Sequence, residues 1–323
     1  IAEPLVPSQR PPAPCGVFVR VAAIDQGTNT TRLLVADVTD GQVAEVVRRS
    51  TITRLGEGVD ARRRLLPLPI TRVRNCLADY RRELESLGAE RSLLVATSAV
   101  RDAENGEAFL GEIEWSYGFT TRLLTGEEEA ELTLRGVGAV DEGTVVIDIG
   151  GGSTELISSG SRVSTDLGSV RLTERFLVSD PPTSSELEAL ARAIRSVLAA
   201  HDVSAELGIG VAGTVTSLAA LDLGLVEYDS ERVDGHRLGE VAVQAQLDRL
   251  AVLPLAERRE VPGLEPERAP VIVAGAAILL EVMRHLHLPE IKVSERDILD
   301  GAALEAAALP EPVEGDAPPG AYT

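Results

Sequence analysis

Residues 145–156 read VVIDIGGGSTEL, an apolar stretch that ends on Asp148 and continues into three glycines. The run of apolar, mostly β-branched residues predicts a buried strand. The glycines predict a turn whose backbone N–H groups can approach an anion. A carboxylate at the end of the strand can reach a metal ion or a water molecule at the edge of a cleft. A glycine-rich hairpin is the alternative, but such a hairpin needs no carboxylate on each side of its turn.

A looser copy of this stretch occurs near the start of the chain. Residues 21–34 read VAAIDQGTNTTRLL, again an apolar strand, an aspartate (Asp25), a turn with hydroxyl side chains and a second strand. Such a repeat predicts a duplicated domain, with one phosphate loop from each half facing the other across a cleft. The arrangement resembles the actin-like phosphotransferase superfamily. We therefore expect an α/β fold of two actin-like (ribonuclease H-like) domains, each with a mixed five-stranded sheet flanked by helices.

The composition is typical of a soluble protein of two domains. The chain has 323 residues, 44% of them hydrophobic, which is enough for a large core. No apolar run approaches the roughly 18 residues of a membrane span, and the proline-rich start lacks the pattern of a signal peptide. Two cysteines, Cys15 and Cys76, imply no disulfide framework and fit a reducing cytoplasm.

The charge is strongly negative and unevenly distributed. The net charge of −20 argues against nonspecific binding of nucleic acid. Residues 1–140 carry 17 arginines and 20 acids, a net charge of −3, whereas residues 141–323 carry 14 basic and 31 acidic residues, a net charge of −17. The first half is therefore the better host for an anionic substrate.

Periodicity and breaks predict the domain boundaries. We expect a disordered leader at 1–16, a first domain at 17–138, a second domain at 139–296 and a disordered tail at 310–323. A terminal helix at 297–309 is expected to join the first domain. Further predicted helices cover 70–87, 185–200, 244–253 and 270–280, and further predicted strands cover 42–53, 93–96, 120–124, 163–167, 207–211 and 291–294.

Two strand-to-helix loops carry candidate functional residues. Arg101 follows the strand at 93–96 in what is predicted to be the first turn of a helix, where a cation opposes the helix dipole. The exposed N–H groups of this turn and the guanidinium together favour a phosphate-binding site. Pairing of Arg101 with a neighbouring acid is the alternative. Thr125 and Glu128 have capping-box spacing, so Glu128 is expected to cap its helix. Glu129 is then the carboxylate expected to point toward the cleft, unless the acidic turn only suits the dipole.

These motifs resemble the exopolyphosphatase and guanosine pentaphosphate phosphohydrolase family over about residues 20–308. The motifs that carry the resemblance are IDQGTNT at 24–30, TSAVR at 97–101, TGEEEA at 125–130 and IDIGGGSTE at 147–155. Two departures from the family pattern are Gln26, which stands where a small or apolar residue is usual, and the expected end of the chain after two domains, without the C-terminal helical region of long members.

The resemblance implies roles for individual residues. Glu129 is implied as the catalytic base, and Asp148 and Glu155, together with Asp25, as the acids linked to a metal ion. Arg101 is implied as a contact of the phosphate chain. The remaining implied substrate contacts lie in or beside the two phosphate loops: Thr28, Asn29, Thr30, Ser98, Gly151, Gly152, Ser153 and Thr154.

The predicted reaction is hydrolytic removal of the terminal phosphate of inorganic polyphosphate, with Mg²⁺ (or Mn²⁺) and a preference for short chains. Hydrolysis of pppGpp to ppGpp, phosphorylation of a sugar by a kinase of the same superfamily, and a nonenzymatic sensor of polyphosphate or (p)ppGpp are the alternatives. We expect a cytoplasmic homodimer, the dimer being implied by the family, with no membrane or nucleic-acid partner.

Overall fold

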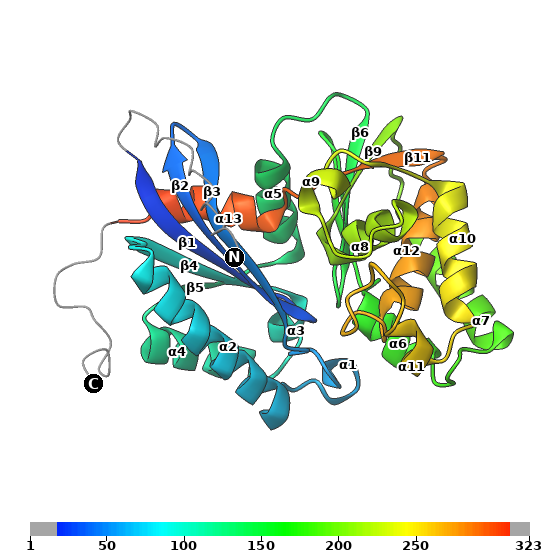
Figure 1. Ribbon diagram of the computed structural model, residues 1–323, viewed down its shortest axis with the longest axis horizontal. Coiled ribbons are helices and arrows are strands. Elements are labelled where there is room, and N and C mark those ends of the chain that lie inside the picture. Colours follow the sequence, from blue (N-terminus) through cyan, green and yellow to red (C-terminus); the bar gives the residue numbers. More distant parts are fainter. Residues whose placement is uncertain (1–17, 311–323) are drawn as a thin grey trace, which may run out of the picture.

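The computed structural model describes residues 18–310, so of the two segments predicted to be disordered, 1–16 and 310–323, all but Pro310 lie outside the described residues. Figure 1 shows two α/β domains side by side, with one sheet in each and α5 (Gly126–Val137) between them. Within the described residues, no helix combines the length and the apolar character needed to cross a membrane.

The sheet of the first domain has the strand order β3-β2-β1-β4-β5. The central strand β1 is apolar on both faces: Ala22 and Ile24 pack toward one group of helices, and Val21 and Ala23 pack toward the other. Burial on both faces explains why β1 reads as a continuous apolar run and not as an alternating one. The strands are β1 (Val19–Gln26), β2 (Thr30–Thr39), β3 (Gln42–Ile52), β4 (Arg91–Ala96) and β5 (Thr120–Leu123).

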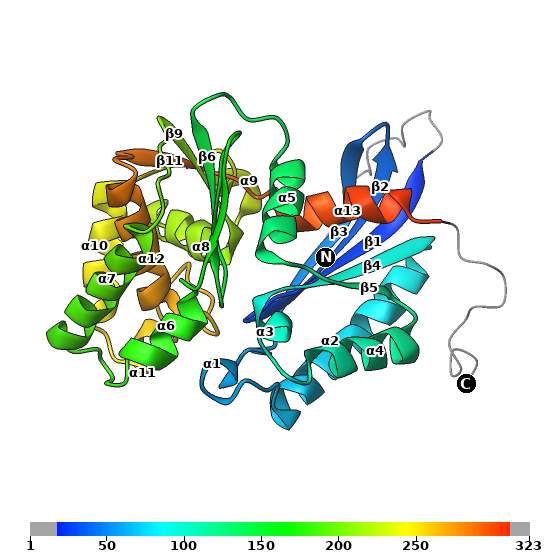
Figure 2. The same cartoon turned by 180° about the vertical axis from the view of Figure 1, so that it is seen from behind.

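Helices cover both faces of this sheet. One face is packed by α2 (Pro67–Ser86) and α4 (Gly106–Tyr117), and the other by α13 (Ile298–Ala308). The terminal helix therefore lies on the first domain although it follows the last strand of the second, as both views show (Figures 1 and 2). Two single-turn helices, α1 (Val59–Arg62) and α3 (Ser98–Arg101), sit in the loops at the cleft end of the sheet.

The sheet of the second domain has six strands, in the order β10-β11-β9-β6-β7-β8, where five were predicted. The additional strand is β10 (Arg237–Gly239), which pairs antiparallel with β11 at the edge of the sheet. Only Leu238 of β10 is buried, and three residues are too few to show a period of two. The other strands are β6 (Thr144–Ile149), β7 (Thr154–Ile157), β8 (Arg162–Thr165), β9 (Leu207–Val211) and β11 (Glu290–Val293).

Disregarding β10, the two sheets have the same topology. Reading from the edge, β8-β7-β6-β9-β11 repeats β3-β2-β1-β4-β5. In the first sheet, β2 pairs antiparallel with both β1 and β3, whereas β4 pairs parallel with both β1 and β5. In the second sheet, β7 likewise pairs antiparallel with β6 and β8, and β9 pairs parallel with β6 and β11. The protein therefore consists of two actin-like domains, as predicted. Because β1 and β6 occupy equivalent central positions, Asp25 and Asp148 near their ends are equivalent residues.

Most helices of the second domain pack on the face of its sheet that is remote from the first domain. Buried residues of β6 at 145, 147 and 149 belong to the same core cluster as these helices, whereas Val146 on the opposite face packs with Ala130 of α5. The helices of the second domain are α6 (Ser169–Phe176), α7 (Ser184–Leu198), α8 (Ala212–Asp222), α9 (Ser230–Val233), α10 (Glu240–Ala251), α11 (Leu255–Arg258) and α12 (Ile272–His285).

The helices α5 and α13 cross between the domains and pack against each other. Each crossing point has a glycine where a side chain has no room: a Cβ on Gly136 would lie 1.8 Å from the carbonyl oxygen of Asp297, and one on Gly301 would lie 1.9 Å from that of Leu132. The backbones of the two helices are therefore in direct contact. This contact fixes how α5, which carries Glu129, is placed relative to the first sheet.

Candidate active site

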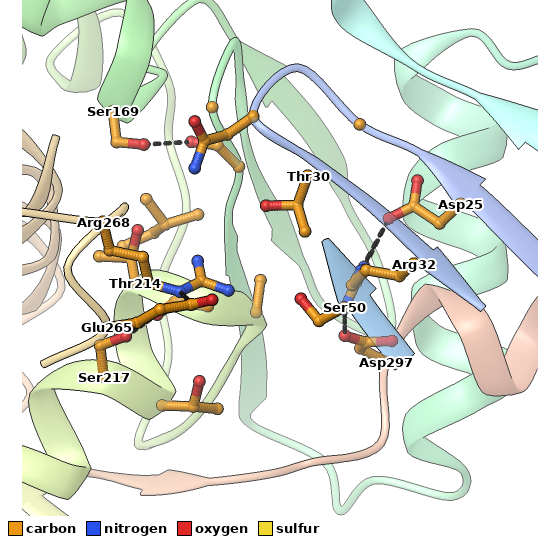
Figure 3. A pocket seen from close by; sticks show the side chains of 18 of the residues that line it. Asp25, Thr30, Arg32, Ser50, Ser169, Thr214, Ser217, Glu265, Arg268 and Asp297 are labelled. Atoms are coloured by element: carbon orange, nitrogen blue, oxygen red, sulfur yellow. Dashed lines mark hydrogen bonds and ion pairs between the residues drawn. The ribbon is translucent and has the colours of Figure 1, made fainter. Parts of the chain in front are cut away.

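A cavity of about 620 Å³ lies between the two sheets. Figure 3 shows that Asp25, Thr30, Arg32 and Asp297 line it on one side and Thr214, Ser217 and Arg268 on the other. The structure therefore brings the two halves of the predicted site together around one cavity. The predicted residues that line it are Asp25, Thr28, Asn29, Thr30, Ser98, Glu129, Asp148, Gly151 and Ser153.

The first phosphate loop is a tight turn between β1 and β2. The N–H of Gly27 donates to the carbonyl oxygen of Thr30 over 2.9 Å, and the hydroxyls of Thr28 and Ser98 lie 2.8 Å apart. Gln26 is fully buried behind the turn, where its Oε1 accepts from Thr31 over 2.8 Å and its Nε2 donates to the carbonyl of Gly27 over 3.1 Å. Gln26 therefore braces the loop from behind and does not line the cavity.

The second phosphate loop is held by its carbonyl groups. The carbonyl oxygens of Gly150 and Gly151 accept from the backbone N–H groups of Ser169 and Val170, over 3.0 and 2.8 Å, at the start of α6. The N–H groups of Gly151 and Gly152 have no acceptor in residues 18–310. Carbonyls turned toward a helix and N–H groups left without partners are the features of an anion nest.

The two loops touch each other, which requires the glycines of the second. A Cβ on Gly151 would lie 2.9 Å from the Cβ of Thr28, and one on Gly152 would lie 2.3 Å from the hydroxyl of Ser98. Gly152 itself does not line the large cavity, because it faces Thr28 and Ser98. An anion bound at this point therefore meets groups from both domains.

Glu129 occupies the first turn of α5. Thr125 and Glu128 form the predicted capping box, which leaves Glu129 free to point inward, and its side chain is buried. Its Oε2 lies 3.3 Å from Nη1 of Arg101, which also donates to the carbonyl of Leu124 over 2.8 Å. Burial and the nearby charge of Glu155 raise the pKa of Glu129 well above its usual value, against the opposing effect of Arg101.

Asp148 and Glu155 are direct neighbours across the β6–β7 pair. The hydroxyl of Thr133 donates to Asp148 over 3.1 Å, and that of Ser164 donates to Glu155 over 2.8 Å. Burial, with the charge of nearby carboxylates, raises the pKa of Asp148 to about 7 and that of Glu155 to about 8. The site therefore brings together more carboxyl groups than its own cations can keep ionised near neutral pH.

Asp25 is bound on one side only. Arg32 donates to its Oδ2 through Nε and Nη2, over 3.0 and 2.7 Å, and reaches Asp297 with its remaining nitrogen. Oδ1 of Asp25 is buried and has no hydrogen-bond partner in the described part of the chain. Burial raises the pKa of Asp25 despite the pairing with Arg32. A buried carboxylate oxygen without a partner, at the wall of a cavity, is a position where a cation would be stabilised.

The residues present fit a hard divalent cation held partly by the substrate. Residues 18–310 contain no group of three or more His, Cys, Asp or Glu side chains arranged as a metal cage. Mg²⁺ does not need one, because it usually binds one or two carboxylates together with phosphate oxygens and water. Asp148 and the unpartnered oxygen of Asp25 offer this donor set at the cavity wall. Glu155 lies behind Asp148 and does not line the cavity, so its direct ligation stays a prediction.

Two further predicted contacts lie outside the cavity wall. The hydroxyl of Thr154 donates to the carbonyl of Leu167 and is fully buried, so it faces away from a substrate in the cavity. Arg101 is expected in the first turn of a longer helix, but α3 is a single turn of four residues that ends at Arg101, so the argument from the helix dipole does not apply. Arg101 reaches the site through its contact with Glu129.

Several residues that line the cavity were missed by the sequence analysis. Arg32 stands opposite Asp25 in the antiparallel β1–β2 pair, and this pairing follows from counting outward from the turn at 27–29. Arg268 lies over Gly213, where a Cβ would be 2.0 Å from its Nη1, and this contact joins distant segments without a local signal. Ala212, at the start of α8, has a φ of 66°, a strained value that is enriched at functional sites.

Comparison with known proteins identifies the family of this chain. The chain matches the Ppx/GppA phosphatase family over residues 34–307. It belongs to this family. The Ppx/GppA chain is 40% identical over 316 residues to exopolyphosphatase 2 of Mycobacterium tuberculosis, covering 90% of this chain and 99% of that protein. It is 28% identical over 301 residues to the guanosine-5'-triphosphate,3'-diphosphate pyrophosphatase of Vibrio atlanticus, covering 88% of this chain and 58% of that protein.

The same family appears among solved structures. The crystal structure of an exopolyphosphatase-like protein superposes with a TM-score of 0.85 at 34% sequence identity, covering 90% of this chain and 99% of the other. The arrangement of the two domains is therefore that of the Ppx/GppA family.

Proposed function

We propose that this Ppx/GppA protein is an exopolyphosphatase, which removes the terminal phosphate of inorganic polyphosphate by hydrolysis. The observation that carries the proposal is the placement of a buried carboxylate, Glu129, on the same cavity as the two loops after β1 and β6 and two further carboxylates, Asp25 and Asp148. Such a set can bind a terminal phosphoryl group, orient a water molecule and accept its proton. The 40% identity to exopolyphosphatase 2 points to the same substrate.

In the proposed reaction the backbone N–H groups of Gly151 and Gly152 and the hydroxyls of Thr28 and Ser98 hold the terminal phosphate. Glu129 orients a water molecule and takes its proton as the water oxygen bonds to phosphorus and the bridging P–O bond breaks. Base catalysis of this kind is worth on the order of a hundred- to ten-thousand-fold in rate. Arg101 favours the ionised form of Glu129 that the step requires.

Mg²⁺ (or Mn²⁺), held by Asp148 and Asp25 with Glu155 beside them, would supply charge neutralisation on the terminal phosphoryl group. Until a cation is present, the raised pKa values of Asp148 and Glu155 leave these groups partly protonated, and a bound cation would favour their ionised form. We also propose that the protein is a homodimer, on the basis of the family resemblance, and that it is cytoplasmic, on the basis of its cysteine content. The charge distribution is the basis for a proposed preference for short polyphosphate chains.

The test is orthophosphate release from polyphosphates of defined length and from pppGpp, each with Mg²⁺, with Mn²⁺ and with EDTA. The proposal predicts release from polyphosphate that requires a divalent ion. Absence of release from every polyphosphate, by a protein shown to be folded by circular dichroism, contradicts it.

Hydrolysis of the terminal phosphate of pppGpp is a second candidate function, and one observation favours it. The wall of the cavity in the second domain includes Val226, Tyr228, Leu264 and Pro266, which offer apolar and aromatic surface that a polyphosphate chain does not use. A nucleoside could pack there while its triphosphate reaches the two loops. If kcat/KM for pppGpp exceeds that for every polyphosphate in the panel, this second function is the main one.

A further inference from the structure

A group of contacts between the two domains is centred on Arg171 of α6, whose side chain is only 7% exposed. Its Nε donates to the carbonyl oxygen of Gly152 over 2.8 Å, within its own domain. Its Nη1 and Nη2 donate to Asp60 and Asp102 over 2.7 and 2.5 Å, and both aspartates belong to the first domain. One guanidinium therefore joins the second phosphate loop to two points on the opposite domain.

Neighbouring residues on the same face of α6 extend this contact. Arg175 forms an ion pair with Asp60, and the carboxylate of Glu174 accepts from the backbone N–H of Gly58 over 3.0 Å. Positions 171, 174 and 175 share a face of a helix because they are three and four residues apart. The hydrogen bond from Arg175 is the largest cause of the lowered pKa of Asp60, so this carboxylate stays ionised at neutral pH.

The start of α6 is also the support of the glycine loop. The backbone N–H of Arg171 donates to the carbonyl oxygen of Gly151 over 3.1 Å, beside the bonds that Ser169 and Val170 donate to the same loop. A Cβ on Gly168 would lie 2.2 Å from the carbonyl carbon of Gly152. Loop and helix therefore move as one body, and Arg171 extends from this body across to the first domain.

We propose that Arg171 is a positioning residue that couples closure of the two domains to the shape of the second phosphate loop. Its contacts with Asp60 and Asp102 form only when the domains are together, and its contact with Gly152 sets the loop in that same state. Arginine suits this task because its planar fork presents several donors in fixed directions, which lysine does not. The catalytic consequence rests on the proposed function, but the closure itself does not.

Three variants separate the two tasks. Arg171→Ala removes the contacts to both aspartates and to the loop. The double substitution Asp60→Asn and Asp102→Asn weakens the ion pairs across the domains, preserves side-chain shape and leaves the bond from Arg171 to Gly152 in place. Arg192→Ala, on the exposed face of α7 with a partner one turn away, is the matched control. The radius of gyration is measured by small-angle X-ray scattering without substrate, and kcat and KM by orthophosphate release from polyphosphate.

The proposal predicts that the radius of gyration increases in Arg171→Ala and in the double variant and stays unchanged in the control. If closure falls to about a tenth of the molecules, KM of the double variant rises roughly tenfold with kcat unchanged. Arg171→Ala additionally loses on the order of a hundredfold in kcat, because the loop is no longer placed.

Radii of gyration equal to that of the unmodified protein in both variants overturn the coupling, whatever the kinetics. Equal kcat values for Arg171→Ala and the double variant overturn the role in shaping the loop. If the unmodified protein releases no phosphate from polyphosphate, the proposed function fails, and the scattering comparison still decides the closure.

Discussion

At the scale of single residues, the site is defined by carboxylates buried close to one another with few cations between them. Asp148 and Glu155 both have pKa values raised toward neutrality, and Asp25 keeps one buried oxygen without a partner in the described residues. Such an arrangement is unfavourable for an empty protein and favourable for one that binds a divalent cation. The buried carboxylates therefore lower the stability of the protein without a cation and favour binding of one.

Substitution of Asp148 tests this interpretation. Asp148→Asn keeps the shape of the side chain but replaces a carboxylate with a weak neutral ligand, so activity falls and added Mg²⁺ restores only part of it. The measurement is the Mg²⁺ dependence of orthophosphate release, with Asp202→Asn, an exposed carboxylate of the same domain, as the control. An unchanged Mg²⁺ dependence in Asp148→Asn contradicts the metal role.

Asp297 makes a residue-scale contribution to stability that depends on pH. Burial alone raises its pKa, but the attraction of Arg32 and Arg48 and a hydrogen bond from Leu299 lower it overall. A carboxyl group with a lowered pKa contributes stability above its unfolded value of about 3.9 and loses it as the pH falls through the folded value.

Asp297→Asn is therefore expected to destabilise the protein by roughly 2 to 4 kcal/mol at pH 7, because it leaves a buried guanidinium with one partner fewer. The difference from the unmodified protein should stay constant from pH 7 to about 5 and shrink below about 4. Urea denaturation at several pH values measures it. A difference that grows as the pH falls contradicts the ion-pair account.

At the scale of elements, the crossing of α5 and α13 holds the helix that carries Glu129. Gly301→Ala removes a residue with poor helix propensity, which by itself would stabilise a helix by about 1 kcal/mol. Its Cβ would lie 1.9 Å from the carbonyl of Leu132, so overpacking dominates and we expect destabilisation by roughly 1 to 3 kcal/mol. Gly111→Ala in α4 is the matched control, since a Cβ at this position would meet nothing within 4 Å. This substitution should stabilise the protein, because alanine has the higher helix propensity. Thermal unfolding of both variants decides whether the crossing is as tight as described.

Elements also show what the sequence could and could not predict. The loops after β1 and β6 and the capping box at Thr125 were predictable because each depends on residues a few positions apart. The pairing of Arg171 with Asp102 and the contact of Arg268 with Gly213 join segments far apart in the chain, so no local pattern indicates them. The position of Arg101 was misjudged because α3 ends after four residues, a boundary that propensity does not resolve.

At the scale of the whole molecule, charge predicts how a long substrate is handled. The arginines that line the cavity already have carboxylate partners in the described structure: Arg32 with Asp25 and Asp297, Arg48 with Glu45 and Asp300, Arg49 with Glu83, and Arg268 with Glu265. Basic side chains bind a polyanion by displacing the counterions condensed on it. Because these arginines already have carboxylate partners, few of them are free to bind the distal part of a long chain. The second half, with a net charge of −17, should repel it.

Weak binding of the distal chain predicts distributive hydrolysis with a relative preference for short polyphosphate. A time course on long polyphosphate, resolved on a gel at low enzyme concentration, should show a ladder in which all molecules shorten together. Full-length substrate persisting beside the end product alone indicates processive hydrolysis, and the charge argument is then wrong.

We propose Glu129 as the base that activates water in a cavity shared by both domains. The most direct measurement is orthophosphate release from polyphosphate with Mg²⁺ by the unmodified protein, Glu129→Gln and Glu128→Gln. Glutamine preserves the capping box, so Glu128→Gln should keep nearly full activity. Glu129→Gln should bind substrate with similar affinity and lose at least about a hundredfold in kcat. A Glu129→Gln protein near full activity beside an inactive Glu128→Gln protein would contradict the account.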